Sequence, residues 1–257
     1  MEELKEKKDT NKENNADKEQ SLIEHIEELR KVLIKCLIAI VIIFIPAFYL
    51  SPYCIDFLIK IIVKGKITLN YFAPMEVFLI QLKISLVIDV LICFPYLAKQ
   101  IWSFIVPALY DNERKFIKNI VFISSFLFIF GVTFCIVFIL PFLINFGISF
   151  STPNINPMFG LSNVIDLSLW MSLIFGCMFQ IPLVVNMLIK WDIISYESVS
   201  SKRSYVIVFL LIFAGLFTPP DIISQLMLFL PTYLLFEFGL LFSKKNIKKE
   251  NKIKKVK

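Results

Sequence analysis

The stretch "NIVFISSFLFIFGVTFCIVFIL", residues 119–140, contains no charged side chain. An apolar run of about 18 or more residues is long enough to cross the hydrocarbon core of a bilayer as one helix. Three more runs of this kind lie at 32–50, 77–98 and 164–189, and the only charges within them are Lys35, Lys83, Asp89 and Asp166. With 57% hydrophobic residues and 27 phenylalanines, the chain is expected to be an all-α, polytopic membrane protein rather than a soluble domain.

Two more spans lie towards the C-terminus, at 204–218 and 222–242, separated by Pro219, Pro220 and Asp221. Adjacent prolines remove two backbone donors and do not fit inside one straight helix, so a tight hairpin of two helices is predicted. The first of these helices reaches only about 22 Å at ~1.5 Å per residue, less than the ~30 Å hydrocarbon core. The sequence thus predicts six transmembrane helices, of which the fifth is short.

The distribution of lysine and arginine predicts the orientation, because these residues concentrate in cytoplasmic segments. With the N-terminus inside, the cytoplasmic segments are 1–31, 99–118, 190–203 and 243–257. Of the 27 basic residues, the only ones outside these segments are Lys35, Lys60, Lys64, Lys66 and Lys83. Both ends of the chain are therefore expected on the cytoplasmic side (N-in, C-in).

The composition divides the chain into three parts. Residues 1–20 are charged, mixed in sign and free of aromatic side chains, which predicts a disordered tail. Residues 21–243 form the membrane domain, with an amphipathic helix expected on the outer surface at 51–66 and an outer loop at 141–163. Residues 244–257 form a lysine-rich cytoplasmic tail, which anionic lipid attracts at about 1 kcal/mol per cation.

Catalytic and metal-binding groups are scarce in this sequence. His25 is the only histidine, so a second histidine for a zinc site is missing, and the five cysteines show no C-x-x-C spacing. No nucleophile is recognisable beside a candidate general base. We therefore expect no enzymatic activity, no metal or other cofactor, and no nucleic-acid partner.

Several polar side chains lie within the predicted spans, where burying a charge costs about 2.5–3.5 kcal/mol or more. Glu76 and Lys83 lie seven residues apart on nearly the same helical face, about 10 Å along the axis. Asp89 lies on a different face of that span, Gln180 in the fourth span and Glu237 in the sixth. Each is compatible with a structural interhelical hydrogen bond, with a polar docking groove or with an ion path.

The cytoplasmic loop "QIWSFIVPALYDNER", residues 100–114, combines aromatic residues and a proline with a charged end: Trp102, Phe104, Pro107, Tyr110, Asp111, Glu113 and Arg114. An aromatic belt at the level of the lipid headgroups accounts for Trp102 and Tyr110, but not for the acidic residues that follow. The Glu113 carboxylate, with Glu28 on the N-terminal helix, offers bidentate partners for guanidinium groups. This pattern suits a ligand with paired arginines followed by an apolar stretch.

Four motifs occur in order along the chain: "HIEELRK" (25–31), "PMEVF" (74–78) with Lys83 after it, "QIWSFIVPALYDNERK" (100–115) and "TPPDIISQ" (218–225). With six spans and a cytoplasmic N-terminus, residues 21–243 closely resemble the TatC family, the multispanning core of the twin-arginine (Sec-independent) protein translocase. The resemblance implies a receptor rather than an enzyme. It also implies a concave, glove-like wall of helices, in which the fifth and sixth are short.

The resemblance further implies what the chain binds. Signal peptides with adjacent arginines are recognised, and small single-span partner subunits of the TatA or TatB type help to move folded proteins across the membrane using the proton-motive force. The implied signal-peptide site comprises Glu113, Phe104, Glu28, Arg30, Pro107, Leu109 and Tyr110. The implied positions for partner helices, or for polar groups within the membrane, are Gln180, Glu76, Lys83, Thr218 and Pro219.

Gln180 stands where some members of the family carry glutamate, so hydrogen bonding to a partner is expected there rather than proton transfer. Contact with membrane lipid and self-association in a receptor complex are also implied. The expected location is the plasma (inner) membrane of a bacterium, in preference to an organellar membrane. The alternative function is a small-solute or ion transporter whose buried polar pathway uses Lys83, Asp89 and Glu237.

Overall fold

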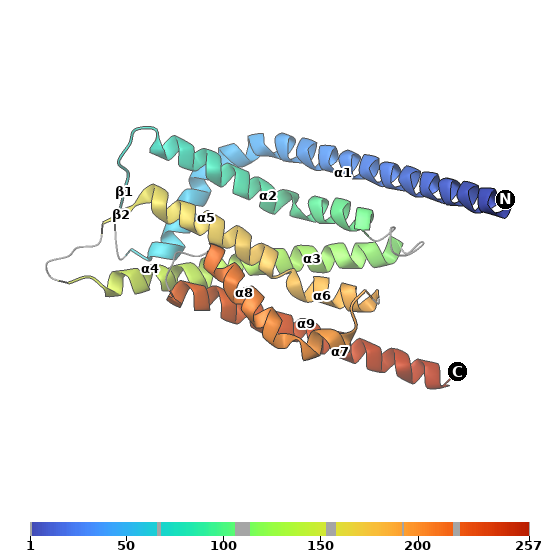
Figure 1. Ribbon diagram of the computed structural model, residues 1–257. Coiled ribbons are helices and arrows are strands. Elements are labelled where there is room, and N and C mark those ends of the chain that lie inside the picture. The colour runs from blue at the N-terminus through green and yellow to red at the C-terminus, as the bar shows by residue number, and fades with distance from the viewer. Residues whose placement is uncertain are drawn as a thin grey trace.

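The computed structural model describes residues 2–65, 68–105, 114–152, 158–191, 193–217 and 222–256. The helices are α1 (Glu2–Val63), α2 (Glu76–Ile105), α3 (Arg114–Phe134), α4 (Leu140–Ser149), α5 (Leu161–Met178), α6 (Ile181–Lys190), α7 (Tyr196–Ser201), α8 (Arg203–Phe217) and α9 (Ile222–Val256). A π-helical turn, η1 (Cys135–Ile139), joins α3 to α4. Two short strands, β1 (Leu69–Asn70) and β2 (Phe159–Gly160), pair in parallel at the end opposite both termini (Figure 1).

The predicted spans correspond to helices that are long and apolar enough to cross a membrane. In the part of the chain that the structure describes, five such stretches occur: Ile26–Val63, Glu76–Ile105, Ile117–Ser149, Leu161–Lys190 and Ile222–Leu241. The helix Arg203–Leu216 is also apolar but shorter. It corresponds to the fifth span, which the sequence predicts to be short. Both termini lie at one end of the molecule, as N-in, C-in topology requires (Figure 1).

The first helix continues through two prolines, Pro46 and Pro52, and bends in this region (Figure 1). A proline lacks the N–H that would bond the carbonyl four residues earlier. The Ser51 hydroxyl donates to the Phe48 carbonyl at 2.8 Å, so the acceptor that Pro52 leaves open is satisfied. The helix predicted at 51–66 is therefore the end of α1. Its apolar face packs in the protein core, while Asp56 and Lys60 are exposed, as an amphipathic helix requires. Its expected position on the outer surface stays a prediction.

Two other boundaries differ from the sequence-based expectation. The chain does not leave the helix at Pro141, because α3, η1 and α4 form one helical stretch to Ser149, and the π-helical turn of η1, closed by the Leu140 N–H bond to the Cys135 carbonyl, directly precedes this proline. The predicted outer loop at 141–163 is thus helical as far as Ser149. The fourth span is divided between α5 and α6 at Phe179 and Gln180, just before Pro182 in the first turn of α6.

The helices α3 and α5 pack closely against each other. A Cβ atom on Gly176 would lie 2.6 Å from a ring carbon of Phe128, and one on Gly131 would lie 2.8 Å from the Phe175 carbonyl oxygen. Phe128 and Phe175 are fully buried, and Phe94 of α2 stacks on Phe128 with ring centroids 3.6 Å apart. Small residues allow such close approach of helices in a membrane, where packing rather than water exclusion drives association.

The two ends of the chain belong to long helices. The sixth span is the apolar first part of α9, and the helix continues into the lysine-rich tail. The helix α1 begins at Glu2, although the composition of residues 1–20 predicts disorder. The expected domain boundaries at 20 and 243 stay predictions.

Candidate functional site

The cytoplasmic end of the molecule gathers the described members of the predicted signal-peptide site. Phe104 lies in the last turn of α2 and is half-buried, whereas Glu28 and Arg30 are exposed on α1. Because α1 packs along α2, these residues belong to neighbouring helices. Four further members of the predicted site (Glu113, Pro107, Leu109 and Tyr110) lie outside the described residues, as do Thr218 and Pro219.

Trp102 plays a different part from the one that an aromatic belt predicts. Its side chain is 8% exposed and packs in a cluster with Ala98, Ile120, Leu183 and Met187. Its ring centroid is 6.3 Å from that of Trp191, at the end of α6. Trp102 is therefore a buried anchor that joins α2, α3 and α6 near the cytoplasmic end of α2. Sequence reasoning missed Trp191, although it is a tryptophan at the predicted cytoplasmic end of a span.

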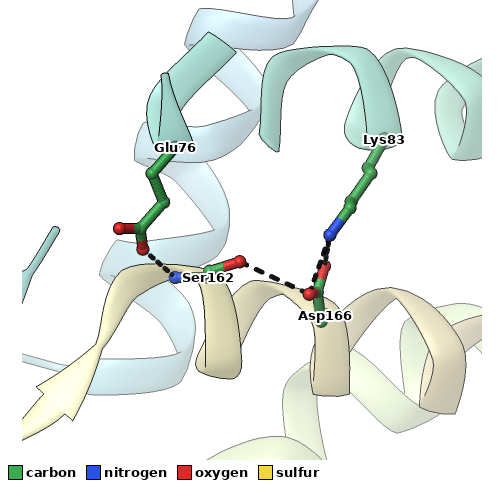
Figure 2. A network of polar contacts seen from close by, with 4 residues as sticks. All are labelled: Glu76, Lys83, Ser162 and Asp166. Atoms are coloured by element: carbon green, nitrogen blue, oxygen red, sulfur yellow. Dashed lines mark hydrogen bonds and ion pairs between the residues drawn. The ribbon is translucent and has the colours of Figure 1, made fainter. Parts of the chain in front are cut away.

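The outer ends of α2 and α5 are joined by the polar cluster in Figure 2. The Lys83 ammonium lies 2.8 Å from both carboxylate oxygens of Asp166, a charge pair between the two helices. The Glu76 carboxylate accepts the Ser162 N–H at 3.0 Å, in the first turn of α5. Its other oxygen accepts the Phe72 N–H at 2.7 Å and the Ala73 N–H at 3.2 Å.

The predicted alignment of Glu76 and Lys83 on one helical face is consistent with this cluster, because both side chains reach α5 (Figure 2). The Ser162 hydroxyl completes the link by donating to Asp166 at 3.4 Å. Glu76 satisfies the N–H of Ser162 at the beginning of α5, where the helix dipole favours a negative charge. The cluster therefore fixes the register of α2 against α5.

Gln180 occupies the break between α5 and α6, where it is half-buried. Its amide Nε2 donates to the Ser124 carbonyl at 3.0 Å, and its Oε1 accepts from the Ser124 hydroxyl at 2.7 Å. Gln180 also lines a groove of about 340 Å³ between α2, α3 and α6, together with Phe94 and Trp102. Both ends of the amide thus bond to α3, while one N–H and one lone pair of Gln180 have no hydrogen-bond partner among the described residues and can meet another partner.

The alternative function, a solute or ion transporter, requires a shared polar pathway through Lys83, Asp89 and Glu237. In the structure each of these side chains contacts a different group. Lys83 pairs with Asp166, while Glu237 lies 3.3 Å from Arg203 and accepts the Tyr233 hydroxyl at 3.0 Å. Asp89 is fully buried and accepts only a weak bond from the Cys93 thiol at 3.4 Å, and its Oδ2 has no hydrogen-bond partner among the described residues. These contacts give no support to the transporter alternative. We have no physical account of Asp89.

Metal chemistry receives no support from the described part of the chain, in which no group of three or more histidine, cysteine, aspartate or glutamate residues is arranged to hold an ion. The five cysteines are free thiols distributed over α1, α2, η1 and α5. Their positions within or against helices fit small apolar packing residues.

Comparison with known proteins shows which family the chain belongs to. The family model described as "Sec-independent protein translocase protein (TatC)" matches residues 24–231. The chain belongs to the TatC family. It is therefore a subunit of the Sec-independent protein translocase and a transport protein rather than an enzyme, as the ordered motifs predict.

The TatC relatives are similar over nearly their whole length. The chain is 34% identical to TatC of Haemophilus influenzae over 236 residues, covering 90% of this chain and 91% of that protein. It is 34% identical to TatC of Carboxydothermus hydrogenoformans, covering 89% and 94% of the two chains. A crystal structure described as "Twin Arginine Translocase Receptor- TatC in DDM" superposes with a TM-score of 0.78 at 30% identity, covering 85% of this chain and 99% of that chain. The predicted TatC-like, all-helical membrane fold is confirmed.

Proposed function

We propose that this TatC-family subunit binds twin-arginine signal peptides at the cytoplasmic end of α1 and α2. Phe104 offers an apolar surface for the stretch that follows the arginines, and the carboxylates of Glu28 and Glu113 hold the two guanidinium groups. The observation that carries the proposal is the half-buried Phe104, which lies in the last turn of α2, two residues after Trp102 and shortly before Asp111 and Glu113 in the sequence. A side chain held at the end of a packed helix needs less ordering on binding.

The charges of the neighbouring residues support a cationic ligand at this position. Arginine pairs with carboxylates through two parallel hydrogen bonds, which lysine does not reproduce. Glu28 and Glu113 supply one carboxylate for each arginine. Arg30 takes a different part and orients a carboxylate or a lipid headgroup. Pro107, Leu109 and Tyr110 shape the platform on which the apolar part of the peptide rests.

Partner subunits form the second part of the proposal. Small single-span subunits of the TatA or TatB type dock on the membrane-embedded helices, and a polar group of one such helix meets the remaining hydrogen-bonding capacity of Gln180. The groove beside Gln180 supports this assignment, since it is apolar apart from the amide and the Ser124 hydroxyl. Thr218 and Pro219 contribute to a second docking edge, and the ion pair of Lys83 with Asp166 holds α2 against α5.

The complex acts in the plasma membrane of a bacterium, in keeping with the bacterial sources of the relatives. There it moves folded proteins outward with the proton-motive force, and copies of this chain associate within the receptor complex. Membrane lipid surrounds the spans.

The test is a binding titration of a fluorescent twin-arginine signal peptide to the purified protein in lipid nanodiscs. Because a hydrogen bond to a charged group contributes about 1.5–3 kcal/mol, Glu113→Gln and Glu28→Gln are each expected to weaken binding at least tenfold. Glu197→Gln, at an exposed carboxylate on α7, is the matched control and leaves the affinity unchanged. If Glu113→Gln and Glu28→Gln bound the signal peptide as tightly as the control Glu197→Gln, this result would contradict the proposed site.

A further inference from the structure

A groove of about 660 Å³ runs between α2 and α3 and is distinct from the groove that contains Gln180. Its walls are mostly apolar, with Pro95 on α2 facing Phe122, Phe126 and Ile129 on α3. The three α3 side chains are 50–74% exposed, so protein covers them only in part. The volume lies in the ~300–1,000 Å³ range of sites that hold small ligands.

The groove has the length of one membrane leaflet. It extends along α3 from Ile117, near the cytoplasmic end, to Ile129. At ~1.5 Å per residue this distance is about 18 Å, close to half of a ~30 Å hydrocarbon core. An acyl chain of a cytoplasmic-leaflet lipid therefore fits the groove in length.

The cytoplasmic mouth of the groove is basic. Lys99 from α2 and Lys118 from α3 lie on its two sides, and the Ser103 hydroxyl lies beside them. No carboxylate is among the described residues that line the groove. Basic pockets between transmembrane helices on the cytoplasmic side bind anionic lipid headgroups. The same two lysines repel the paired arginines of a signal peptide, which makes a peptide the poorer occupant.

We propose that this groove binds one anionic glycerophospholipid of the cytoplasmic leaflet. The lipid phosphate lies between Lys99 and Lys118, and one acyl chain lies against Phe122, Phe126 and Ile129. The bound lipid joins the cytoplasmic ends of α2 and α3, the helices on either side of segment 106–113. Lipid binding does not depend on the proposed signal-peptide site.

Native mass spectrometry of the purified protein tests the proposal, with phosphatidylglycerol and phosphatidylcholine of identical acyl chains added in titration. Phosphatidylglycerol is expected to bind more tightly, with one copy retained. Because each cation contributes about 1 kcal/mol, the Lys99→Gln/Lys118→Gln double variant is expected to weaken phosphatidylglycerol binding roughly 30-fold. The matched control is Lys31→Gln/Lys35→Gln, which removes two exposed lysines at and just inside the cytoplasmic end of the first span and leaves binding unchanged.

A second variant tests the acyl part of the site without changing charge. Phe122→Ala removes a side chain that is 74% exposed, so the fold is retained, and it is expected to weaken phosphatidylglycerol binding several-fold. Equal binding of the two lipids, or an equal effect of the two double-lysine variants, would show general surface attraction and overturn the proposal. Displacement of the lipid by a twin-arginine peptide that crosslinks to position 122 would assign the groove to the peptide instead.

Discussion

Breaking the ion pair between Lys83 and Asp166 tests how the outer ends of α2 and α5 are held together. The perturbation is a set of three variants: Lys83→Met, Asp166→Asn, and the double variant that carries both. The pair joins residues 83 positions apart in the chain, with two oxygen atoms at 2.8 Å from one nitrogen. Its contribution to stability depends on whether the pair lies in hydrocarbon or near interfacial water.

The depth of the pair follows from the helix length. The 30 residues of α2 extend about 45 Å at ~1.5 Å per residue, which exceeds a ~30 Å hydrocarbon core by about 15 Å. A centred helix therefore projects about 7 Å at each end, and Lys83, about 10 Å from Glu76, lies only about 3 Å inside the core. The side chains of Lys83 and Asp166 are 48% and 37% exposed, so protein covers them only in part. At this depth a long lysine side chain extends its charged end to the interface.

This location sets the expected energies. Exposed ion pairs contribute about 0.2–1 kcal/mol, whereas a charge at the centre of a transmembrane helix costs about 2.5–3.5 kcal/mol. We expect each single variant to lower the unfolding free energy by about 1 kcal/mol, the upper end of the exposed range. The double variant is expected to lose about the same amount, because it leaves no unpaired charge behind, which gives a coupling energy of about 1 kcal/mol.

The assay is reversible unfolding in mixed detergent micelles, analysed as a double-mutant cycle. Lys60→Met is the control, because Lys60 is an exposed lysine on α1 with no ion-pair partner among the described residues. It is expected to leave stability unchanged. Additivity within about 0.3 kcal/mol would show that the pair does not form, and coupling above about 2.5 kcal/mol would show that it lies in dry hydrocarbon.

Two further predictions concern the packing of α3 against α5 and α6. Gly176→Ala is expected to lower the unfolding free energy by about 1–3 kcal/mol, because its Cβ would lie 2.6 Å from Phe128, whereas Gly147→Ala, with its nearest contact at 3.6 Å, is neutral or stabilising. Equal thermal stability of these two variants would contradict the close packing. Gln180→Leu is expected to cost about 1–2 kcal/mol and Ser124→Ala less, because only the former removes both hydrogen bonds. A larger loss for Ser124→Ala in the same unfolding assay would refute the reciprocal pair.

Hydrophobic patterning predicted the spans well, since each apolar run corresponds to a helical stretch long enough to cross the membrane or, for the fifth span, to a shorter apolar helix. It predicted their ends poorly near prolines. The boundaries expected after Leu50 and before Pro141 lie inside helical segments, because a serine hydroxyl satisfies the carbonyl that Pro52 exposes and a π-helical turn precedes Pro141. Such local compensation depends on backbone geometry, which composition does not encode.

The partners of the polar residues were less predictable than the residues themselves. Glu76 bonds to a residue 86 positions away, and such long-range contacts leave no local pattern. One signal was available in the sequence: Lys83 and Asp166 carry opposite charges, and each lies near the outer end of a predicted span. For Trp102 the sequence was misleading. Its position at the end of a span predicted an aromatic belt at the lipid headgroups, whereas its side chain is buried between helices.

The central claim, that this TatC-family subunit recognises paired arginines beside Phe104, is tested most directly by photo-crosslinking. A photoreactive amino acid at position 104, in native membranes, is exposed to a signal peptide with Arg-Arg or with Lys-Lys. The account predicts a crosslink with Arg-Arg, little with Lys-Lys, and loss of the crosslink in Glu113→Gln. Equal labelling by both peptides, or labelling that Glu113→Gln leaves intact, would contradict it.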